Sequence, residues 1–215
     1  MSVWVIVVAA GGGTRFGSAK QFELLGDSTV IDRSVATAQR CADGVVVVLP
    51  PADVRWQAPE GLLTVAGGAT RSGSVRAGLA RVPSDAEVII VHDAARPLAT
   101  PALYEATIAA VRAGAHAAIP GSPVTDTIKR VGGSTVIATV DRRDLVAVQT
   151  PQAFAGAALR AAHAQPDAEG TDDAALIEAN GGTVVVVAGE PRNLKLTVAD
   201  DLIVARALLD LGDQP

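Results

Sequence analysis

Four short apolar runs, built mostly from Val and Ile, constrain the fold more than any other feature of the sequence. They are Val3 to Val8, Val45 to Leu49, Val88 to Val91 and Thr183 to Val187. Apolar and polar residues do not alternate in them, so we expect both faces of each strand to be buried, as in a parallel sheet covered by helices on both sides. The sequence therefore predicts an α/β fold with a doubly wound, mostly parallel sheet.

Helix-like stretches lie between and after these runs. They are Val30 to Cys41, Ser74 to Arg81, Pro101 to Ala113, Ala155 to Ala164, Asp172 to Asn180, and Val198 to Leu211. Thr171 resembles an N-cap of the fifth stretch, and Thr197 with Asp200 resembles a weak capping box of the last one. The alternation of strands and helices predicts right-handed crossovers. A chain of 215 residues is expected to form a single domain, residues 1–215.

The segment from Val124 to Val148 breaks this alternation. It reads VTDTIKRVGGSTVIATVDRRDLVAV, with short strand-like pieces on either side of Gly132-Gly133 and no helix signal. This pattern predicts a β-hairpin arm that projects from the sheet. Because an isolated hairpin is only marginally stable, we expect the arm, residues 124–148, to pack on a second copy of the chain and form a homodimer.

Composition excludes several classes of function. A net charge of −5 and an aromatic content of 3% argue against binding to a nucleic-acid polymer. A single cysteine, Cys41, excludes an internal disulfide framework and a cysteine-based zinc site. No uncharged apolar run reaches the roughly 18 residues of a membrane span, and no basic segment precedes the first apolar run. We therefore expect a cytoplasmic protein that does not bind a membrane.

A glycine-rich loop follows the first apolar run. It contains Ala10, Gly11, Gly12 and Gly13, followed by Arg15 and Lys20. Ligands of open α/β sheets bind at the carboxyl ends of strands, and glycines let backbone N–H groups approach phosphate oxygens. The loop therefore predicts a phosphate site; the alternative is an ordinary turn with two solvated cations. It is not a P-loop, and Phe16 replaces the third glycine of a dinucleotide fingerprint, which disfavours an NAD-dependent oxidoreductase.

Two further charged residues follow strands. Asp93 lies just after the third apolar run, where phosphates would repel a carboxylate unless a divalent cation lay between them. We therefore expect Asp93 to hold Mg²⁺ together with substrate phosphates, the alternative being a cap of a turn or helix. Lys195 lies shortly before the last helix, where the helix dipole disfavours a cation. That placement indicates a bound anion in preference to a solvated surface charge.

Seven segments resemble, in order and nearly end to end, the 2-C-methyl-D-erythritol 4-phosphate cytidylyltransferase family. They are VIVVAAGGGTRFGSAKQF, AGGATRSGSV, VHDAARP, PVTDTIKR, TVDRRDLVAVQTPQAF, GTDDAALIE and NLKLTVADDL. HDAARP and the final N-x-K-x-T pattern are the most discriminating. The resemblance implies a Rossmann-like nucleotidyltransferase fold. It also implies transfer of the cytidylyl group of CTP to 2-C-methyl-D-erythritol 4-phosphate, with release of pyrophosphate, in isoprenoid precursor biosynthesis.

The resemblance also implies roles for individual residues. Arg15, Lys20 and Lys195 would be catalytic, and Asp93 would bind the metal. The residues that would bind CTP are Ala10, Gly11, Gly12, Gly13, Gly68, Arg71 and Ser74. Those that would bind the acceptor are Arg96, Thr127, Arg142 and Thr171. Of these, Thr127 and Arg142 lie in the arm and would bind the acceptor across the dimer interface. The simpler alternatives are a capped turn around Gly68 to Ser74 and solvated hairpin residues at Thr127 and Arg142.

Two positions depart from the family pattern. Ala19 replaces the usual proline before the loop lysine, and Ala69 replaces an acidic residue, which weakens the assignment of CTP over another nucleotide. Two other functions remain open. A pentitol cytidylyltransferase acting on ribitol 5-phosphate would share the loop, HDAARP and the mechanism. A non-catalytic nucleotide-binding module would share the loop, but binding would not require Arg15, Lys20, Asp93 and Lys195 together.

Overall fold

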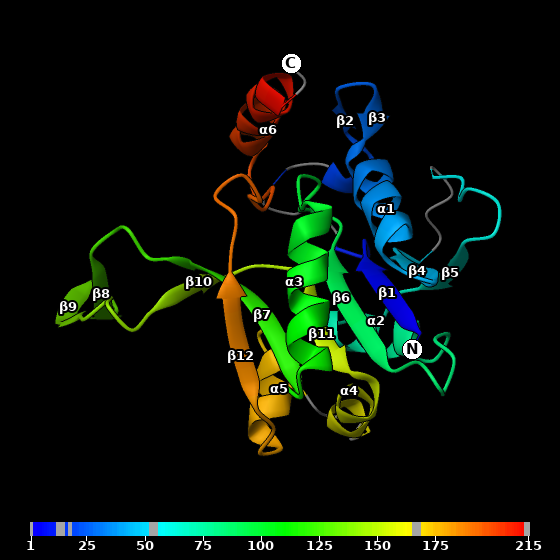
Figure 1. The fold of residues 1–215 in the computed structure, drawn as a ribbon. Helices are drawn as coiled ribbons and strands as arrows, with labels where there is room; N and C mark the ends of the chain where they lie inside the picture. Colours follow the sequence, from blue (N-terminus) through cyan, green and yellow to red (C-terminus); the bar gives the residue numbers. More distant parts are fainter. Residues whose placement is uncertain (1, 12–15, 17–18, 52–55, 165–168, 213–215) are drawn as a thin grey trace.

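A central sheet organises the molecule (Figure 1). The computed structural model describes residues 2–11, 16, 19–51, 56–164 and 169–212. Within these ranges the sheet has eight strands: β1 (Val3–Val8), β4 (Gly44–Leu49), β5 (Leu63–Ala66), β6 (Val88–Asp93), β7 (Ala117–Pro123), β10 (Val146–Val148), β11 (Gln152–Ala155) and β12 (Val184–Ala188). The strand order is β10-β7-β11-β6-β1-β4-β5, and β12 pairs with β7.

Most neighbouring strands are parallel, which confirms the predicted fold class. β1 pairs in parallel with β4 and β6, β4 with β5, and β7 with β12. The exceptions are β10 and β11: β11 lies between β6 and β7 and is antiparallel to both, while β10 is antiparallel to β7. The carboxyl ends of β1, β5 and β6 therefore meet at one edge of the sheet.

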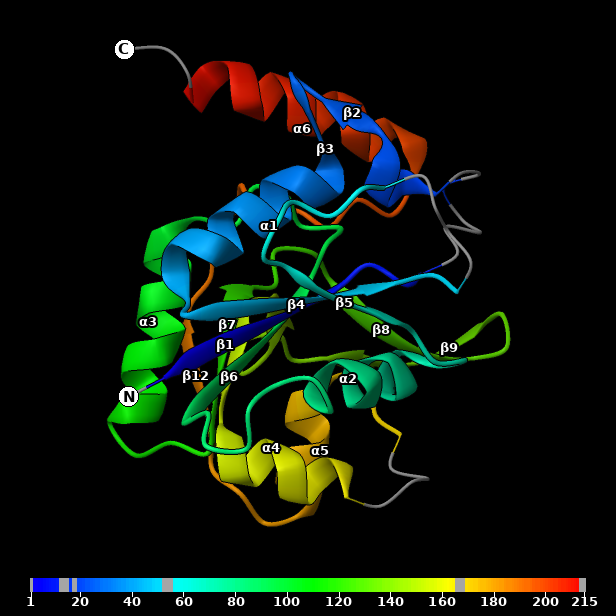
Figure 2. The same cartoon turned by 90° about the vertical axis from the view of Figure 1, so that its right-hand side faces the viewer.

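Helices cover both faces of the sheet, which explains why the strands carry unbroken apolar runs (Figure 2). Val5 of β1 packs in a core with α1 (Val30–Cys41) and α3 (Pro101–Arg112). The next residue, Ile6, packs on the other face with α2 (Arg71–Leu79), α4 (Gly156–His163) and α5 (Asp173–Ala179). Both side chains are fully buried. No helix in the described part of the chain is long and apolar enough to cross a membrane.

A smaller apolar cluster lies at the carboxyl edge of the sheet. It joins α6 (Ala199–Gly212) to the short hairpin of β2 (Leu24–Leu25) and β3 (Ser28–Thr29) through Leu25, Leu196 and Leu202. A 3-10 turn, η1 (Lys20–Phe22), precedes that hairpin. The cluster thereby brings two segments far apart in sequence, around Lys20 and Lys195, to the same edge.

Two predicted helix caps were assigned to the wrong residue. The N-cap of α5 is Asp172, whose carboxylate accepts a hydrogen bond from the Ala175 N–H, and Thr171 precedes it as an exposed residue. At the start of α6 it is Asp201, not Asp200, that accepts hydrogen bonds from the backbone N–H and the hydroxyl of Thr197. In both cases a carboxylate one position further on has the better reach to the free N–H groups.

The predicted hairpin arm is present and projects from the sheet (Figure 1). It consists of β8 (Ile128–Gly132) and β9 (Thr135–Val140), joined by a turn in which Gly133 has a φ of +58°. Glycine suits this turn because the left-handed region is costly for residues with a Cβ. The arm is shorter than predicted at its C-terminal end, because Val146–Val148 forms β10 and pairs with β7 in the main sheet.

Candidate active site

A cavity of about 350 Å³ opens at the carboxyl ends of β1, β5 and β6. Eight of the residues predicted to bind the nucleotide, the metal or the reacting phosphate line it: Ala10, Gly11, Lys20, Gly68, Arg71, Ser74, Asp93 and Lys195. They come from five separate parts of the chain, so the fold gathers them. Gly12, Gly13 and Arg15 lie outside the described residues.

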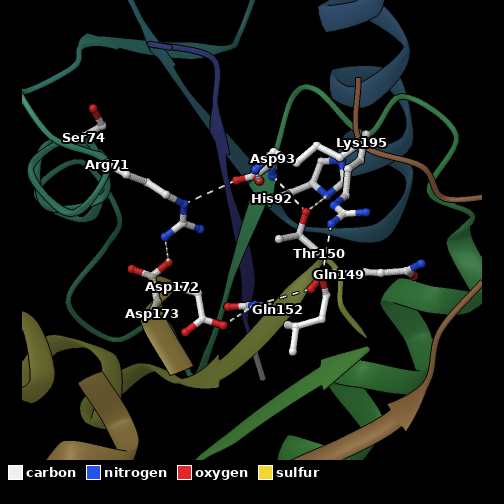
Figure 3. Close-up of polar contacts among 12 residues, drawn as sticks. Arg71, Ser74, His92, Asp93, Gln149, Thr150, Gln152, Asp172, Asp173 and Lys195 are labelled. Atoms are coloured by element: carbon white, nitrogen blue, oxygen red, sulfur yellow. Dashed lines mark hydrogen bonds and ion pairs between the residues drawn. The ribbon is translucent and has the colours of Figure 1, made fainter. Parts of the chain in front are cut away.

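Asp93, the last residue of β6, lies between two cations (Figure 3). The Lys195 ammonium is 2.6 Å from one carboxylate oxygen, and Nε of Arg71 is 3.5 Å from the other. Burial by itself would raise the pKa of Asp93, but Arg71 and Lys195 outweigh it and hold the pKa at about 2. Asp93 is therefore ionised at neutral pH. Its side chain forms ion pairs and does not cap a turn or helix, which was the alternative interpretation of the sequence.

The segment that carries Lys195 is fixed on both sides of the lysine. Asn193 is fully buried, and its amide donates to the Thr150 carbonyl at 2.9 Å. Leu196 is fully buried, and its N–H donates to the Ala95 carbonyl at 2.8 Å. The carbonyl of Leu196 accepts a hydrogen bond from Nζ of Lys20. The two predicted catalytic lysines therefore share one anchored segment, which accounts physically for the N-x-K pattern.

A buried polar pair lies behind Asp93 (Figure 3). The Thr150 hydroxyl accepts a hydrogen bond from the Asp93 N–H at 3.0 Å. It lies 3.1 Å from Nδ1 of His92, to which the hydroxyl can donate its proton. Burial lowers the pKa of His92 to about 4, so the imidazole is neutral at neutral pH. His92 is fully buried and does not line the cavity, so it supports the end of β6 and is not a ligand. The role of Thr150 was not predicted from the sequence.

The wall formed by the N-terminus of α2 requires small residues. A Cβ on Gly67 would lie 2.4 Å from the Cβ of Ala10, and one on Gly68 would lie 2.8 Å from the backbone of Gly73. The Ser74 hydroxyl faces the cavity and donates to the Thr70 carbonyl at 2.9 Å. The helix begins at Arg71, three residues before the predicted start, because Thr70 caps it. The capped turn, which was the alternative to a ligand site here, is present, and the same residues also form a wall of the cavity.

The four residues predicted to bind the acceptor do not line this cavity. The guanidinium of Arg96 donates to the carbonyls of Asn193, at 2.7 Å, and Val148, at 3.2 Å. Thr127 and Arg142 are exposed near the base of the arm, and Arg142 donates to a backbone carbonyl of the same segment. Thr171 is exposed next to α5. A single chain therefore does not bring these residues to the cavity.

Sequence reasoning missed the partners of Arg71. Nη1 of Arg71 lies 2.7 Å from the carboxylate of Asp173, which also accepts from Nε2 of His163 at 2.9 Å. The sequence pattern assigned no functional role to either Asp173 or His163. The signal was the Asp172-Asp173 pair, because one carboxylate suffices to cap a helix and the other is then free to pair elsewhere.

Comparison with known proteins agrees with this geometry. Residues 3–211 match the family model described as "IspD: 2-C-methyl-D-erythritol 4-phosphate cytidylyltransferase". A 2-C-methyl-D-erythritol 4-phosphate cytidylyltransferase of Rhodococcus opacus is 45% identical over 98% of this chain and 96% of its own length. A bifunctional enzyme IspD/IspF of Clavibacter michiganensis is 46% identical over 95% of this chain. The chain spans about half the length of that protein and of a second bifunctional relative, 54% and 56%.

Solved structures show the same relationship. The crystal structure of 2-C-methyl-D-erythritol 4-phosphate cytidylyltransferase from Thermus thermophilus superposes with a TM-score of 0.83 at 36% identity, covering 98% of this chain and all of that one. The family model spans nearly the whole chain, and the eight cavity residues lie within or beside the motifs that carried the resemblance. The chain belongs to the 2-C-methyl-D-erythritol 4-phosphate cytidylyltransferase family.

Proposed function

We propose that the protein transfers the cytidylyl group of CTP to 2-C-methyl-D-erythritol 4-phosphate and releases pyrophosphate, a step in isoprenoid precursor biosynthesis. The observation that carries the proposal is that Arg71 and Lys195 pair with Asp93 in a cavity at the carboxyl ends of parallel strands, which Lys20 also lines. Such a cluster suits a nucleoside triphosphate, whose phosphates need several cations in fixed positions.

The reaction is a direct displacement at phosphorus. An oxygen of the acceptor phosphate attacks the α-phosphorus of CTP and forms the new P–O bond. The bond from the α-phosphorus to the oxygen that bridges it to the β-phosphorus breaks, and pyrophosphate leaves with that electron pair. A phosphate monoester has a second pKa of about 6, so the attacking oxygen is already ionised at neutral pH and needs no general base. The neutral, buried His92 has no part in this step.

Catalysis then rests on positioning and on charge. Lys20 and Lys195 line the cavity, Lys20 bonded to the anchored segment that carries Lys195, and both would offset the negative charge that grows on the α-phosphoryl oxygens. The ion pair with Asp93 holds the Lys195 ammonium in place before the substrate arrives, so little reorganisation is needed. We propose that Arg15 adds a further cation and that Gly12 and Gly13 contribute backbone donors.

The residues present fit a Mg²⁺ ion held largely by the substrate. Asp93 is the one acidic side chain that lines the cavity in the described part of the chain, and no cluster of three potential ligands occurs there. One carboxylate together with substrate phosphates is a common way to hold Mg²⁺. We propose that Asp93 provides this ligand. When bound, the ion would neutralise phosphate charge and polarise the phosphoryl oxygens.

The acceptor site is proposed to be completed by a second copy of the chain. Thr127 and Arg142 are exposed and lie away from the cavity of their own chain. The arm and the strand that leads from it also expose apolar side chains: Val131, Val136, Ile137, Val146 and Val148. Exposed apolar side chains gathered on a projecting hairpin favour burial against another protein. We propose a cytoplasmic homodimer joined through the arm, with the partner's arm next to each cavity.

One assay tests the proposal. CTP and Mg²⁺ are incubated with the protein and with either 2-C-methyl-D-erythritol 4-phosphate or ribitol 5-phosphate, and pyrophosphate release is followed. We expect release with the first acceptor and little with the second. Release with ribitol 5-phosphate alone would assign a pentitol cytidylyltransferase. Binding of CTP without product from either acceptor would indicate a nucleotide-binding module and would refute catalysis.

A further inference from the structure

A fully buried carboxylate stands behind the cavity wall without touching the cavity. Asp173 is the first residue of α5 and has no exposed surface. One of its oxygens lies 2.7 Å from Nη1 of Arg71, and the other lies 2.9 Å from Nε2 of His163. A buried ion costs free energy unless it is paired and hydrogen-bonded. Each oxygen of Asp173 meets that need with a different partner.

Arg71 is the link between this buried carboxylate and the cavity (Figure 3). Its guanidinium lies between Asp173 on α5 and Asp93 on β6. The contact with Asp173 is short, 2.7 Å, whereas the contact with Asp93 is 3.5 Å. Because the guanidinium is planar and rigid, fixing Nη1 on Asp173 also fixes the direction of the remaining N–H donors. Asp173 therefore determines how close Arg71 comes to Asp93.

That distance has a consequence for the substrate. Asp93 is already paired with Lys195 at 2.6 Å. If Asp173 did not hold Arg71, the guanidinium would be free to form a closer, two-pronged pair with Asp93. The remaining N–H donors of Arg71 would then be occupied by Asp93, and the guanidinium would move across the cavity that it now lines. Holding Arg71 back keeps those donors at the cavity wall, where a nucleotide phosphate can accept from them.

His163 fixes the carboxylate that fixes Arg71. It is the last residue of α4, and its side chain is 1% exposed. Among the described residues Nδ1 of His163 has no hydrogen-bond partner, so its contact with this network runs through Nε2. The contact holds the second oxygen of Asp173, so the carboxylate cannot rotate while it keeps its hydrogen bond to Arg71. Neither His163 nor Asp173 lines the cavity.

We propose that Asp173 and His163 are positioning residues for CTP, acting through Arg71. The ends of α4, α5 and α2 meet in this contact and set the guanidinium at the cavity wall. The inference rests on the proposed function, because it assigns CTP as the ligand that Arg71 meets. It adds a residue pair that contacts neither substrate yet governs the affinity for one of them.

The test is a double-mutant cycle between Asp173→Asn and Arg71→Ala. The readouts are kcat and KM for each substrate, together with CTP binding by titration calorimetry. Asp173→Asn should raise the KM and Kd for CTP about tenfold, the usual size of losing one charge-assisted hydrogen bond, while the KM for the acceptor changes less than about twofold. In the Arg71→Ala background the same substitution should change CTP affinity less than about twofold, because the group that it positions is gone.

His163 is tested by rescue. His163→Ala should weaken CTP binding about fivefold, a smaller effect than Asp173→Asn because Asp173 keeps its pair with Arg71. His163→Gln, whose side-chain amide supplies an N–H donor in place of the imidazole Nε2, should restore most of the affinity. The control is Leu159→Ala on the same helix: Leu159 is fully buried and packs in the same core, so this variant should melt at a lower temperature with unchanged CTP affinity.

Two results would overturn the inference. One is an effect of Asp173→Asn that is as large in Arg71→Ala as in the natural sequence. The other is a loss of CTP affinity in Leu159→Ala equal to that in His163→Ala, since either would mean general loosening of the fold. Failure of the proposed function looks different: the unmodified protein would form no cytidylyl product. The calorimetric cycle with CTP would still decide whether Asp173 acts through Arg71.

Discussion

Replacing Lys195 by methionine removes one ammonium and leaves a side chain of similar length. Lys195 lies 2.6 Å from Asp93 and is 40% exposed, so its interaction is partly screened by solvent. The pKa of Asp93 falls from 3.8 to about 2, a difference worth about 2 kcal/mol that is shared between Arg71 and Lys195. We therefore expect Lys195→Met to lower the unfolding free energy by about 1 kcal/mol, or about 3 °C in Tm.

Activity should fall much further than stability. Removing one preorganised group that stabilises charge in the transition state costs about 3 kcal/mol, so kcat/KM should drop about a hundredfold. Pyrophosphate release measures the activity, and thermal unfolding measures the stability. Arg81→Met is the control, because Arg81 is exposed in the turn after α2 and does not line the cavity. It should leave kcat/KM within about twofold and the unfolding free energy within about 0.5 kcal/mol.

A second substitution separates the two effects of Lys195. In Lys195→Met, Arg71 is the remaining ion-pair partner of Asp93 in the described structure. Adding Asp93→Asn removes this partly unpaired carboxylate. The double variant should be more stable than the sum of the single losses predicts, and it should remain as inactive as Lys195→Met. The reasoning is refuted if folded Lys195→Met keeps a kcat/KM within about threefold of the natural protein, since the expected loss is about a hundredfold.

Three further predictions follow from the site and the arm. Gly67→Ala should weaken CTP binding at least about tenfold, because its Cβ would lie 2.4 Å from that of Ala10 and displace the loop; calorimetry that finds unchanged affinity would contradict this. Ile137→Asp, at a side chain 65% exposed on the arm, should convert the proposed dimer to a monomer in light scattering and lower activity with it; an active monomer would rule out a shared site. The pKa of Asp93 is lower in the folded protein than its ordinary value, so its stabilising effect is complete above about pH 4 and is lost as the pH falls toward 2. Urea unfolding at about pH 5 and about pH 3 should show the gap between the natural protein and Asp93→Asn shrinking by about 1 kcal/mol, and a constant gap would exclude the ion pairs as its cause.

The strands that the sequence reveals are those whose burial follows from their own residues. β1 runs from Val3 to Val8 as predicted, because six consecutive apolar residues can pack against helices on both faces of the sheet. β7 was missed, because its sequence AAIPGSP combines proline and glycine with few β-branched residues. Its strand conformation is imposed by β12 on one edge and by β10 and β11 on the other, which is information that no local window contains.

The site divides in the same way. Gly11 and Asp93 lie at the ends of two runs that the sequence identifies as parallel strands, so their common edge follows from topology and the sequence sufficed to predict it. The Asp172-Asp173 pair indicates one carboxylate free to pair elsewhere, but its partners Arg71 and His163 could not be predicted, because they meet it only after α4 and α5 have packed against α2. Helix caps were placed one residue off at Asp172 and Asp201 for a related reason: which of several adjacent polar side chains reaches the free N–H groups depends on how the start of the helix packs.

The insertion of β11 between β6 and β7 also sets an order of assembly during synthesis. β6 and β7 are not neighbours, so the half-sheet of β5, β4, β1 and β6 has no partner on its β6 edge until residue 155 has been made. A nascent chain therefore exposes an open parallel edge while the arm and β10 emerge. Lys195 arrives forty residues later than β11 and closes on Asp93. The cation that completes the cavity follows every strand of the described sheet in the sequence, so a chain that stops before residue 195 cannot hold the proposed substrate in its finished site.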